Sequence, residues 1–430
     1  MLTVPEALES IIRHSSRLEP MRVPLAEGLG LVLARDAISD LDSPPFDKAL
    51  MDGYALRSAD VREGAARLRV VDEVLAGQTS RRTIQSGDAI RIMTGAPIPA
   101  GADAVVQVER TQLETTGTQQ IVTITNAGQV PPGRNIMKRA ESLSAGTCVV
   151  PAGRRLRAQE IGALAELGQS RISVIRAPRV AILATGDELV PIDEVPGPGQ
   201  IRNSNEMMLA AQVRQMGAHP VMLGVARDKP DELLARIRQG LEYDVLLLSG
   251  GVSAGKLDLV PAALEAAGVQ QVFHKVQVKP GQPLWFGTNR IESVERSHSL
   301  GEMRCYVNTG GMESEESGPC RVFGLPGNPV SSMVCCELFV GTLIRRLMGI
   351  EPAIPQTFRG SLTREHFHGG NRPTYHPARW EWTDYGGRVE PVTWKGSADL
   401  SATVAANALA IFTEPDRLYP ADSVIDVLVW

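Results

Sequence analysis

Two short turns that contain glycine stand directly after apolar runs. Thr185-Gly186-Asp187-Glu188 follows the run Val180–Ala184, and Ser249-Gly250-Gly251-Val252-Ser253 follows Asp244–Leu248. Glycine lets the backbone turn sharply, and the N–H groups that such a turn leaves free can hold phosphate oxygens. One such turn is more often structural than functional, because strand-to-helix turns commonly contain glycine. Two turns at matching ends of neighbouring strands favour a phosphate-binding site.

Acidic residues recur in the same region. Asp187 and Glu188 belong to the first turn, and Asp228 and Asp258 follow later along the chain. Clustered carboxylates on loops commonly hold Mg²⁺, a hard cation that binds carboxylate and phosphate oxygens. Each of these residues taken alone is better explained as a solvated surface group or a helix cap. The hypothesis of a magnesium site therefore depends on their convergence in space.

Cationic and rigid segments follow. Lys275 and Lys279 flank a predicted strand and could bind an oxyanion as point charges, although a solvated strand end explains them equally well. The Pro- and Gly-rich stretch 324–329 precedes a predicted helix and would present backbone groups to a ligand. His366 and His368 lack an evident third ligand, which favours surface histidines over a metal site. The sequence contains no Ser-His-Asp order, HExxH helix, Walker lysine loop or zinc knuckle.

Strands and helices that alternate must position these loops. Apolar strands are predicted at 180–184, 220–225 and 244–248, with helices at 205–216, 231–241 and 261–267. Strands that are apolar throughout and alternate with helices predict a parallel, doubly wound sheet buried on both faces. Such a sheet binds ligands at the carboxyl ends of its strands, which is where both glycine turns fall.

A chain of 430 residues exceeds the roughly 250–300 that one core supports, and its texture changes along its length. Four regions are predicted: an α/β domain (1–19 and 175–349), a helical or extended connecting region (20–43 and 147–174), a β-rich inserted module (44–146) and a C-terminal β-domain (350–430). The polar stretch 289–321 interrupts the first as a surface insertion, more consistent with disorder than with a functional loop. The fold class is thus multidomain α/β plus β.

Composition excludes several classes of protein. The chain is 43% hydrophobic and 22% charged, with a formal net charge of −5, which gives no reason to expect nucleic acid or a membrane as partner. No apolar run reaches the roughly 18–20 residues that a membrane span needs. Residues 1–19 predict an amphipathic helix, with Val4, Leu8 and Ile11 on one face, and not a signal peptide. Five cysteines without metal-ligand spacing, including adjacent Cys335-Cys336, indicate buried thiols and a cytoplasmic protein.

The order of short motifs resembles the molybdopterin molybdenumtransferase family, which includes the E domain of gephyrin. The matching segments follow the family's order and cover nearly the whole chain apart from 289–321. They are Pro44–Asp47, Met51–Ala55, Met93–Pro97, Pro99–Asp103, Gly133–Ile136, Thr185–Leu189, Asn203–Asn205, Ser249–Ser253, Lys279–Gly281, Gly324–Pro329 and Gly396-Ser397. Each motif is weak by itself, whereas the ordered set is highly specific.

The resemblance implies an elongated homodimer whose active cleft lies between the molybdopterin-binding α/β domain of one subunit and the β-rich module of the other. Members take adenylylated molybdopterin and molybdate as substrates, cleave the adenylate with the help of Mg²⁺, and release AMP as molybdenum is inserted. The molybdopterin adenylyltransferase is then a candidate partner.

The family's functional positions can be transferred one by one. The implied metal-binding residues are Asp187, Glu188, Asp228 and Asp258, and the last three are also implied to be catalytic, together with Asp52 from the second subunit. The implied substrate-binding residues are Thr185, Gly186, Ser249, Gly250, Gly251, Ser253, Pro326, Pro329, Lys275, Lys279, Arg372 and Ser397.

Three positions depart from the family pattern. Ser142 stands where the family usually has an aspartate, Gln282 where it has a lysine, and Pro377 where a second arginine is expected near Arg372. Loss of a carboxylate weakens cation binding, and loss of a cation weakens attraction for an oxyanion. A working transferase is the favoured function, and the alternative is a catalytically weakened paralogue that binds molybdopterin or the cofactor as a carrier or scaffold. An unrelated nucleotide-binding enzyme is a third hypothesis, which no Walker lysine loop or full GxGxxG supports.

Overall fold

The chain forms two compact units. The computed structural model describes residues 1–252, 259–289 and 318–430. Ser253, Asp258 and most of the predicted insertion at 289–321 lie outside these residues. The units comprise 1–34, 153–157 and 171–430 in the first, and 35–152 and 158–170 in the second. These two units do not test the boundaries of the four regions predicted from the sequence, which stay predictions.

A six-stranded sheet forms the centre of the first unit, with the order β17-β14-β18-β21-β20-β19. Its strands span His219–Ala226 (β17), Arg179–Thr185 (β14), Val245–Ser249 (β18), Arg321–Leu325 (β21), Trp285–Asn289 (β20) and Val269–His274 (β19). The first four are parallel, as predicted, but β20 runs antiparallel to both of its neighbours. The expectation of a wholly parallel sheet is wrong at this edge, because β19 and β20 are joined without the crossover helix that parallel neighbours need.

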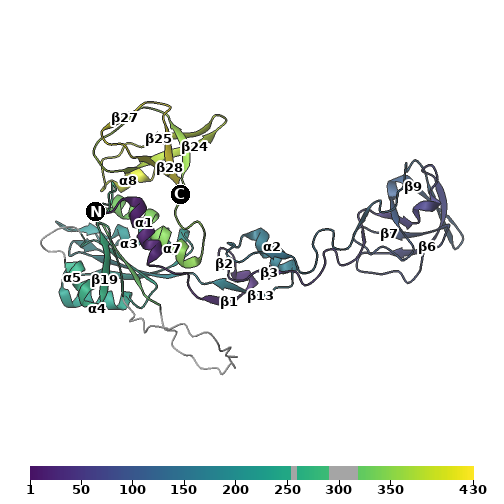
Figure 1. Ribbon diagram of the computed structural model, residues 1–430, viewed down its shortest axis with the longest axis horizontal. Coiled ribbons are helices and arrows are strands. Elements are labelled where there is room, and N and C mark those ends of the chain that lie inside the picture. The colour runs from purple at the N-terminus through teal and green to yellow at the C-terminus, as the bar shows by residue number, and fades with distance from the viewer. Residues whose placement is uncertain (253–258, 290–317) are drawn as a thin grey trace, which may run out of the picture. The chain divides into compact units, whose positions relative to one another are not determined.

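Helices cover both faces of this sheet, which confirms the doubly wound arrangement (Figure 1). Side chains along β14 alternate, so that Val180 and Ile182 enter one core cluster and Ala181 and Leu183 enter the other. The first face is covered by α1 (Val4–Arg13), α3 (Ser204–Gln215), α6 (Pro329–Cys335), a π-helical turn (Cys336–Val340) and α7 (Gly341–Met348). The second is covered by α4 (Pro230–Gly240) and α5 (Leu259–Ala266). The strand ends are therefore where the sheet can meet a ligand.

Helix α1 confirms the predicted amphipathic helix near the N-terminus. Its first turn is closed by a capping box, in which Thr3 Oγ1 accepts from the N–H of Glu6 and the Glu6 carboxylate accepts from the N–H of Thr3. Leu8 and Ile11 on its apolar face are buried in the core of the α/β sheet. Within the described part of the chain, no helix is both long enough and apolar enough to cross a membrane.

A closed barrel in the same unit confirms the predicted C-terminal β-domain. Its strands are β22 (Phe358–Leu362), β25 (Gly386–Pro391), β24 (Thr374–Thr383), β26 (Ala408–Phe412) and β28 (Val424–Val429). The remaining elements of the unit are β1 (Pro20–Pro24), β2 (Val32–Leu33), β13 (Arg171–Ile175), β15 (Leu189–Val190), β16 (Ile201–Arg202), β23 (His366–His368), β27 (Arg417–Tyr419), α8 (Leu400–Thr403) and a 3₁₀ turn (Leu25–Glu27).

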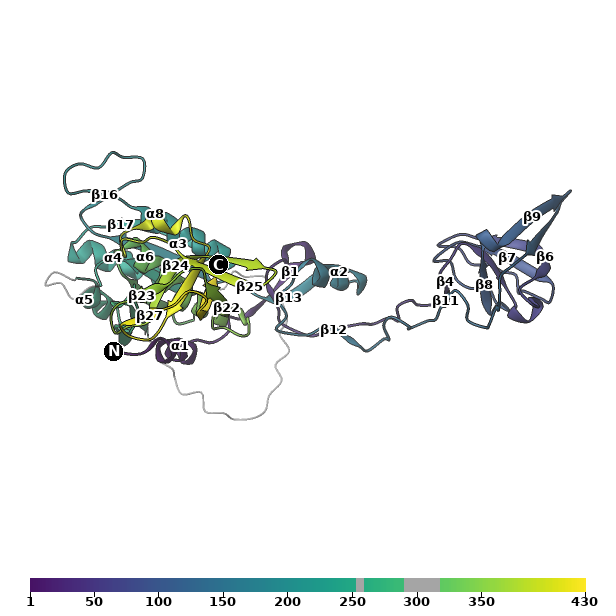
Figure 2. The same ribbon diagram turned by 90° about the horizontal axis from the view of Figure 1, so that it is seen from above.

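A second six-stranded sheet forms most of the second unit and confirms the predicted β-rich module (Figure 2). In sheet order its strands are β8 (Ala104–Gln107), β5 (Gly53–Leu56), β7 (Asp88–Ile92), β6 (Ala66–Val74), β10 (Gln119–Ile124) and β9 (Thr111–Thr116). The unit also contains β3 (Ala37–Ile38) paired with β12 (Cys148–Val150), β4 (Lys48–Ala49) paired with β11 (Ile136–Met137), α2 (Ala158–Glu166), and 3₁₀ turns at Ser58–Asp60 and Val108–Arg110.

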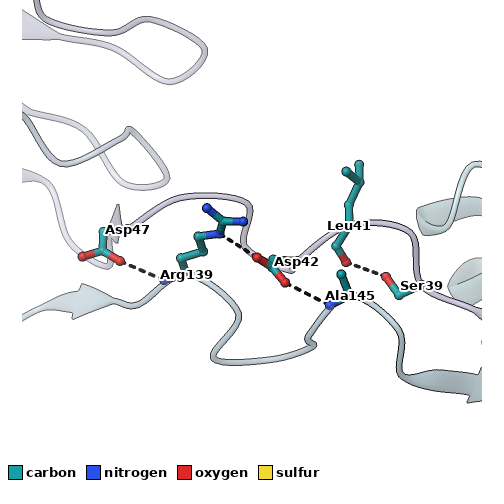
Figure 3. Close-up of polar contacts among 6 residues, drawn as sticks. All are labelled: Ser39, Leu41, Asp42, Asp47, Arg139 and Ala145. Atoms are coloured by element: carbon teal, nitrogen blue, oxygen red, sulfur yellow. Dashed lines mark hydrogen bonds and ion pairs between the residues drawn. The ribbon is translucent and has the colours of Figure 1, made fainter.

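Aspartates tie together the two extended segments that carry these short strand pairs (Figure 3). Asp42 accepts hydrogen bonds from the N–H of Ala145 at 2.9 Å and from Nε of Arg139 at 2.6 Å. Asp47 accepts from the N–H of Arg139 at 2.8 Å and from Nζ of Lys138 at 2.8 Å. These donors favour the ionised form, so the pKa of each carboxyl is lowered, chiefly by Ala145 at Asp42 and by Lys138 at Asp47. The segments are thus held together by carboxylates as well as by backbone pairing.

Candidate active site

A pocket of about 710 Å³ opens at the carboxyl ends of β14 and β18, where the sequence predicted a ligand site. It brings together many of the predicted residues. Those that line it are Thr185, Gly186, Glu188, Asp228, Ser249, Gly250, Gly251, Pro326 and Pro329. They come from turns far apart in sequence, which meet because parallel strands end at the same edge of the sheet. We call this cavity the glycine pocket.

The Gly250-Gly251 turn admits no larger side chain. Gly250 has φ +102° and Gly251 has φ +64°, in the range that favours glycine. A Cβ at Gly250 would lie 2.7 Å from the carbonyl oxygen of Thr185, and one at Gly251 would lie 2.6 Å from Cγ2 of Val260. Within the described residues, the buried Oγ1 of Thr185 has no hydrogen-bond partner. A buried hydroxyl without a partner beside a bare backbone turn indicates a place for a polar ligand.

Asn205 joins the glycine turn to the Pro/Gly-rich loop on the other side of the pocket. Its Nδ2 donates to Oγ of Ser249 at 2.9 Å and to the carbonyl oxygen of Gly327 at 2.8 Å. The N–H of Gly250 also donates to the carbonyl oxygen of Leu325 at 3.1 Å. Sequence reasoning did not assign a role to Asn205. The Asn203–Asn205 motif at the start of α3 was the available signal, because an amide there can bridge two loops.

Three of the four predicted acidic residues gather at the rim of this pocket. Asp187 Oδ1 accepts from the N–H of Asp228 at 3.2 Å, and Glu188 and Asp228 line the cavity. Burial, followed by the nearby charges of Asp187 and Glu188, raises the pKa of Asp228. A cation would relieve this repulsion, and carboxylate oxygens are suitable donors for Mg²⁺. No three acidic, histidine or cysteine side chains of the described chain are close enough to hold a metal as they stand, and Asp258 lies outside that part.

A second pocket of about 650 Å³ lies between the edge of the α/β sheet and the barrel. The predicted residues that line it are Lys279, Pro326, Arg372 and Ser397, and Lys395 adds another cationic group. We call it the cationic pocket. Pro283, Pro326 and Asn328 line both cavities, so the two pockets adjoin. Nδ2 of Asn328 donates to Oγ of Ser397 at 2.9 Å, which fixes the hydroxyl at this common wall.

Three histidines form part of the cationic pocket, and the interpretation of His366 and His368 as surface residues is wrong. His368 is 2% exposed and hydrogen-bonds with Oγ1 of Thr374 at 2.9 Å, while the half-buried His366 stacks on Phe412 with 4.2 Å between ring centres. Burial, followed by neighbouring His376, lowers the pKa of His366 to about 4. Burial also lowers the pKa of His376. Both imidazoles are therefore neutral near pH 7 and leave the positive charge of the pocket to its lysines and arginine.

Two predicted residues lie elsewhere. Lys275 lines neither pocket, and its backbone, at φ +70°, forms the turn between β19 and β20 by donating to the carbonyl oxygen of Leu284. Asp52 belongs to the second unit, where Oδ1 accepts from the N–H and Oγ1 of Thr94, both at 2.7 Å. Both bonds lower the pKa of Asp52, and the bond from the N–H of Thr94 has the larger effect. Asp52 thus supports the turn that follows β7, and its catalytic role stays a prediction.

Comparison with known proteins agrees with this arrangement. Residues 2–168 match the family described as the MoeA N-terminal region (domain I and II), and residues 181–346 match the probable molybdopterin binding domain. The chain is 32% identical to the molybdopterin molybdenumtransferase of Staphylococcus epidermidis, over 100% of this chain and 95% of the relative. It is 35% identical to that of a Nostoc species, over 80% of this chain and 74% of the relative.

Solved structures give the same result. Two crystal structures of the molybdopterin biosynthesis MoeA protein from Pyrococcus horikoshii have TM-scores of 0.79 and 0.77 and identities of 28% and 27%. Both matches cover 100% of this chain, and 99% and 100% of the solved chains. The doubly wound fold and the match over residues 181–346 assign the chain to the α/β proteins with a probable molybdopterin binding domain. Within that class, the chain belongs to the molybdopterin molybdenumtransferase family, which acts in molybdenum cofactor biosynthesis.

Proposed function

We propose that this protein inserts molybdenum from molybdate into adenylylated molybdopterin and releases AMP. The observation that carries the proposal is the shared wall of Pro283, Pro326 and Asn328, which joins a glycine-lined pocket to a cationic one. A phosphate-linked pterin needs backbone N–H groups and a cation, whereas molybdate, a dianion, needs cationic side chains. Adjoining pockets of these two kinds suit a reaction that brings both substrates together.

The glycine pocket would bind the adenylylated pterin. The backbone N–H of Gly251 would hold a phosphate oxygen, and the unpaired hydroxyl of Thr185 would contribute one further hydrogen bond. Glu188 and Asp228, with Asp187 beside them, would hold Mg²⁺. When bound, the cation neutralises charge on the phosphates as AMP leaves. The raised pKa of Asp228 supports this assignment, because it reflects repulsion between clustered carboxylates that a bound cation would relieve.

The cationic pocket would bind molybdate. Lys279 is exposed and its Nζ lies 3.5 Å from the carbonyl oxygen of Gly369, so its charge is available to an anion. Arg372 and Ser397 supply hydrogen-bond donors in the same cavity, and the neutral His366 and His376 add no charge of their own. Lysine and arginine near a common wall would draw the dianion toward the pterin.

Release of AMP tests the proposal directly. Purified protein mixed with adenylylated molybdopterin, Mg²⁺ and molybdate is expected to release AMP and form a molybdenum–pterin product. Asp228→Asn should lower the rate at least tenfold, whereas Asp231→Asn, an exposed aspartate three residues further on, should retain it. Absence of AMP and product above background would refute the proposal. Retention of molybdopterin without AMP release would support the alternative of a binding paralogue, which the serine at Ser142 favours.

We also propose that the active protein is a homodimer in which Asp52 of one subunit acts with the α/β domain of the other. The support is the family resemblance, together with the exposure of Asp52 in its own module. Asp52→Asn should lower the rate as Asp228→Asn does, and mixing the two impaired variants should restore part of the activity, because one site of a mixed dimer would be intact. A strict monomer in sedimentation, or no recovery after subunit exchange, would refute the shared site.

A further inference from the structure

Gln282 contacts Arg372 across the cationic pocket, although 90 positions separate them in sequence. Its Oε1 accepts a hydrogen bond from Nη1 of Arg372 at 2.7 Å. The atom that faces the guanidinium must be the amide oxygen, because a guanidinium donates and never accepts. Nε2 of the same amide lies 3.4 Å from Sδ of Met1. The glutamine side chain is therefore held at both ends, and its oxygen points at the arginine.

This contact leaves one edge of the arginine available. Nη1 donates to Oε1 of Gln282 and, at 3.5 Å, to the carbonyl oxygen of Val278. In the described part of the chain, Nε and Nη2 of Arg372 have no protein acceptor. Those two nitrogens carry the parallel N–H pair with which arginine binds an oxyanion through two hydrogen bonds. Since Arg372 lines the pocket, this unpaired edge is the part of the guanidinium that remains for a ligand.

We propose that Gln282 is a positioning residue, which orients Arg372 so that its Nε–Nη2 edge binds the oxyanion. The inference rests on the proposed function, which takes that oxyanion to be molybdate. Gln282 stands where the family pattern has a lysine, and a lysine there would donate instead of accept. It would leave Nη1 only the long bond to the carbonyl oxygen of Val278, at 3.5 Å, and would place a second cation beside the guanidinium. The neutral glutamine supplies one charge fewer but fixes the arginine before the anion arrives.

Binding of sodium molybdate to the full-length protein, measured by calorimetry, tests this role. Gln282→Met keeps nearly the same shape but removes the acceptor, and it should weaken binding about tenfold, as expected for one lost charge-assisted hydrogen bond. Gln282→Lys should be at least as weak. Gln282→Leu serves as a second variant if the methionine protein is unstable. Gln277→Met is the matched control, because Gln277 lies in the same connection and its side chain makes no hydrogen bond within the described residues.

Two further readouts separate positioning from packing. In the AMP-release assay, KM for molybdate should rise about tenfold in Gln282→Met while kcat changes less than twofold. The double variant Gln282→Met/Arg372→Ala should bind molybdate no more weakly than Arg372→Ala alone, because the glutamine acts through the arginine. A purely structural glutamine would give additive losses.

The outcomes distinguish this inference from the proposed function. Wild-type affinity in Gln282→Met, tighter binding in Gln282→Lys, or additive losses in the double variant would overturn the positioning role and leave the proposed function intact. A wild-type protein that does not bind molybdate, or Arg372→Ala binding as tightly as wild type, would overturn the assignment of the cationic pocket. The positioning role would then fall with it.

Discussion

Of the glycine-to-alanine substitutions in the Gly250-Gly251 turn, Gly250→Ala should disrupt the glycine pocket more. At φ +102° an L residue is strained by roughly 1–3 kcal/mol. The new Cβ would also lie 2.7 Å from the carbonyl oxygen of Thr185, a backbone atom at the end of a central strand that cannot move away cheaply. Overpacking of this kind adds roughly 1–3 kcal/mol, so the expected loss is about 4 kcal/mol.

Tryptophan fluorescence during urea unfolding measures this loss, because all 5 tryptophans belong to the first unit. Gly268→Ala is the matched control: Gly268 has φ +82°, but an added Cβ there meets no atom within 4 Å, so only backbone strain of about 1–2 kcal/mol is expected. Affinity for AMP should fall at least tenfold in Gly250→Ala and stay unchanged in Gly268→Ala. Equal stability losses in the two variants would refute the steric reasoning, and unchanged AMP affinity would refute the turn as a phosphate site.

Three further predictions follow from local geometry. Burial and neighbouring carboxylates raise the pKa of Asp228, so its ionised form opposes folding. Asp228→Asn should therefore raise Tm of the metal-free protein at pH 7. This gain in Tm should vanish as the pH falls through the pKa of Asp228. In differential scanning fluorimetry, Mg²⁺ should then raise Tm of the wild type more than that of the variant. The pKa of His366 is lowered from 6.5 to about 4, so the first unit should lose stability as the pH falls from about 6.5 toward 4. In urea unfolding, the free energy of unfolding should fall less between pH 7 and pH 5 in His366→Phe than in the wild type. Ala140 has φ +62°, so Ala140→Gly should stabilise the second unit by up to about 1 kcal/mol in scanning calorimetry, whereas Ala145→Gly should destabilise it.

The glycine pocket was predictable from sequence because its parts follow from chain geometry. A buried apolar run followed by a glycine turn places that turn at the carboxyl end of a strand, and parallel strands bring such ends together. Thr185, Glu188 and Ser249 therefore meet in one cavity, as expected. The gathering of Asp187, Glu188 and Asp228 follows from the same rule.

The cationic pocket was less predictable because its walls come from two domains. His366 and His368 are two residues apart on β23 and so share one side of the strand, but only the packing of the barrel buries that side. The sequence showed that Gln282 replaces the lysine of the family pattern. It did not show that the glutamine accepts a hydrogen bond from Arg372, because the two residues are 90 positions apart. Lys275 was assigned by residue type alone, and its left-handed backbone conformation leaves no trace in the sequence pattern.

The two adjacent cysteines near the cationic pocket, Cys335 and Cys336, are buried and unreactive. Cys335 lies beneath the cationic pocket, its Sγ 3.5 Å from the carbonyl oxygen of Gly281, and both it and Cys336 are fully buried. Burial raises the pKa of both thiols, so neither offers the thiolate that soft metals and oxidants attack. Neither thiol therefore competes for a metal or an oxidant at the wall of the cationic pocket.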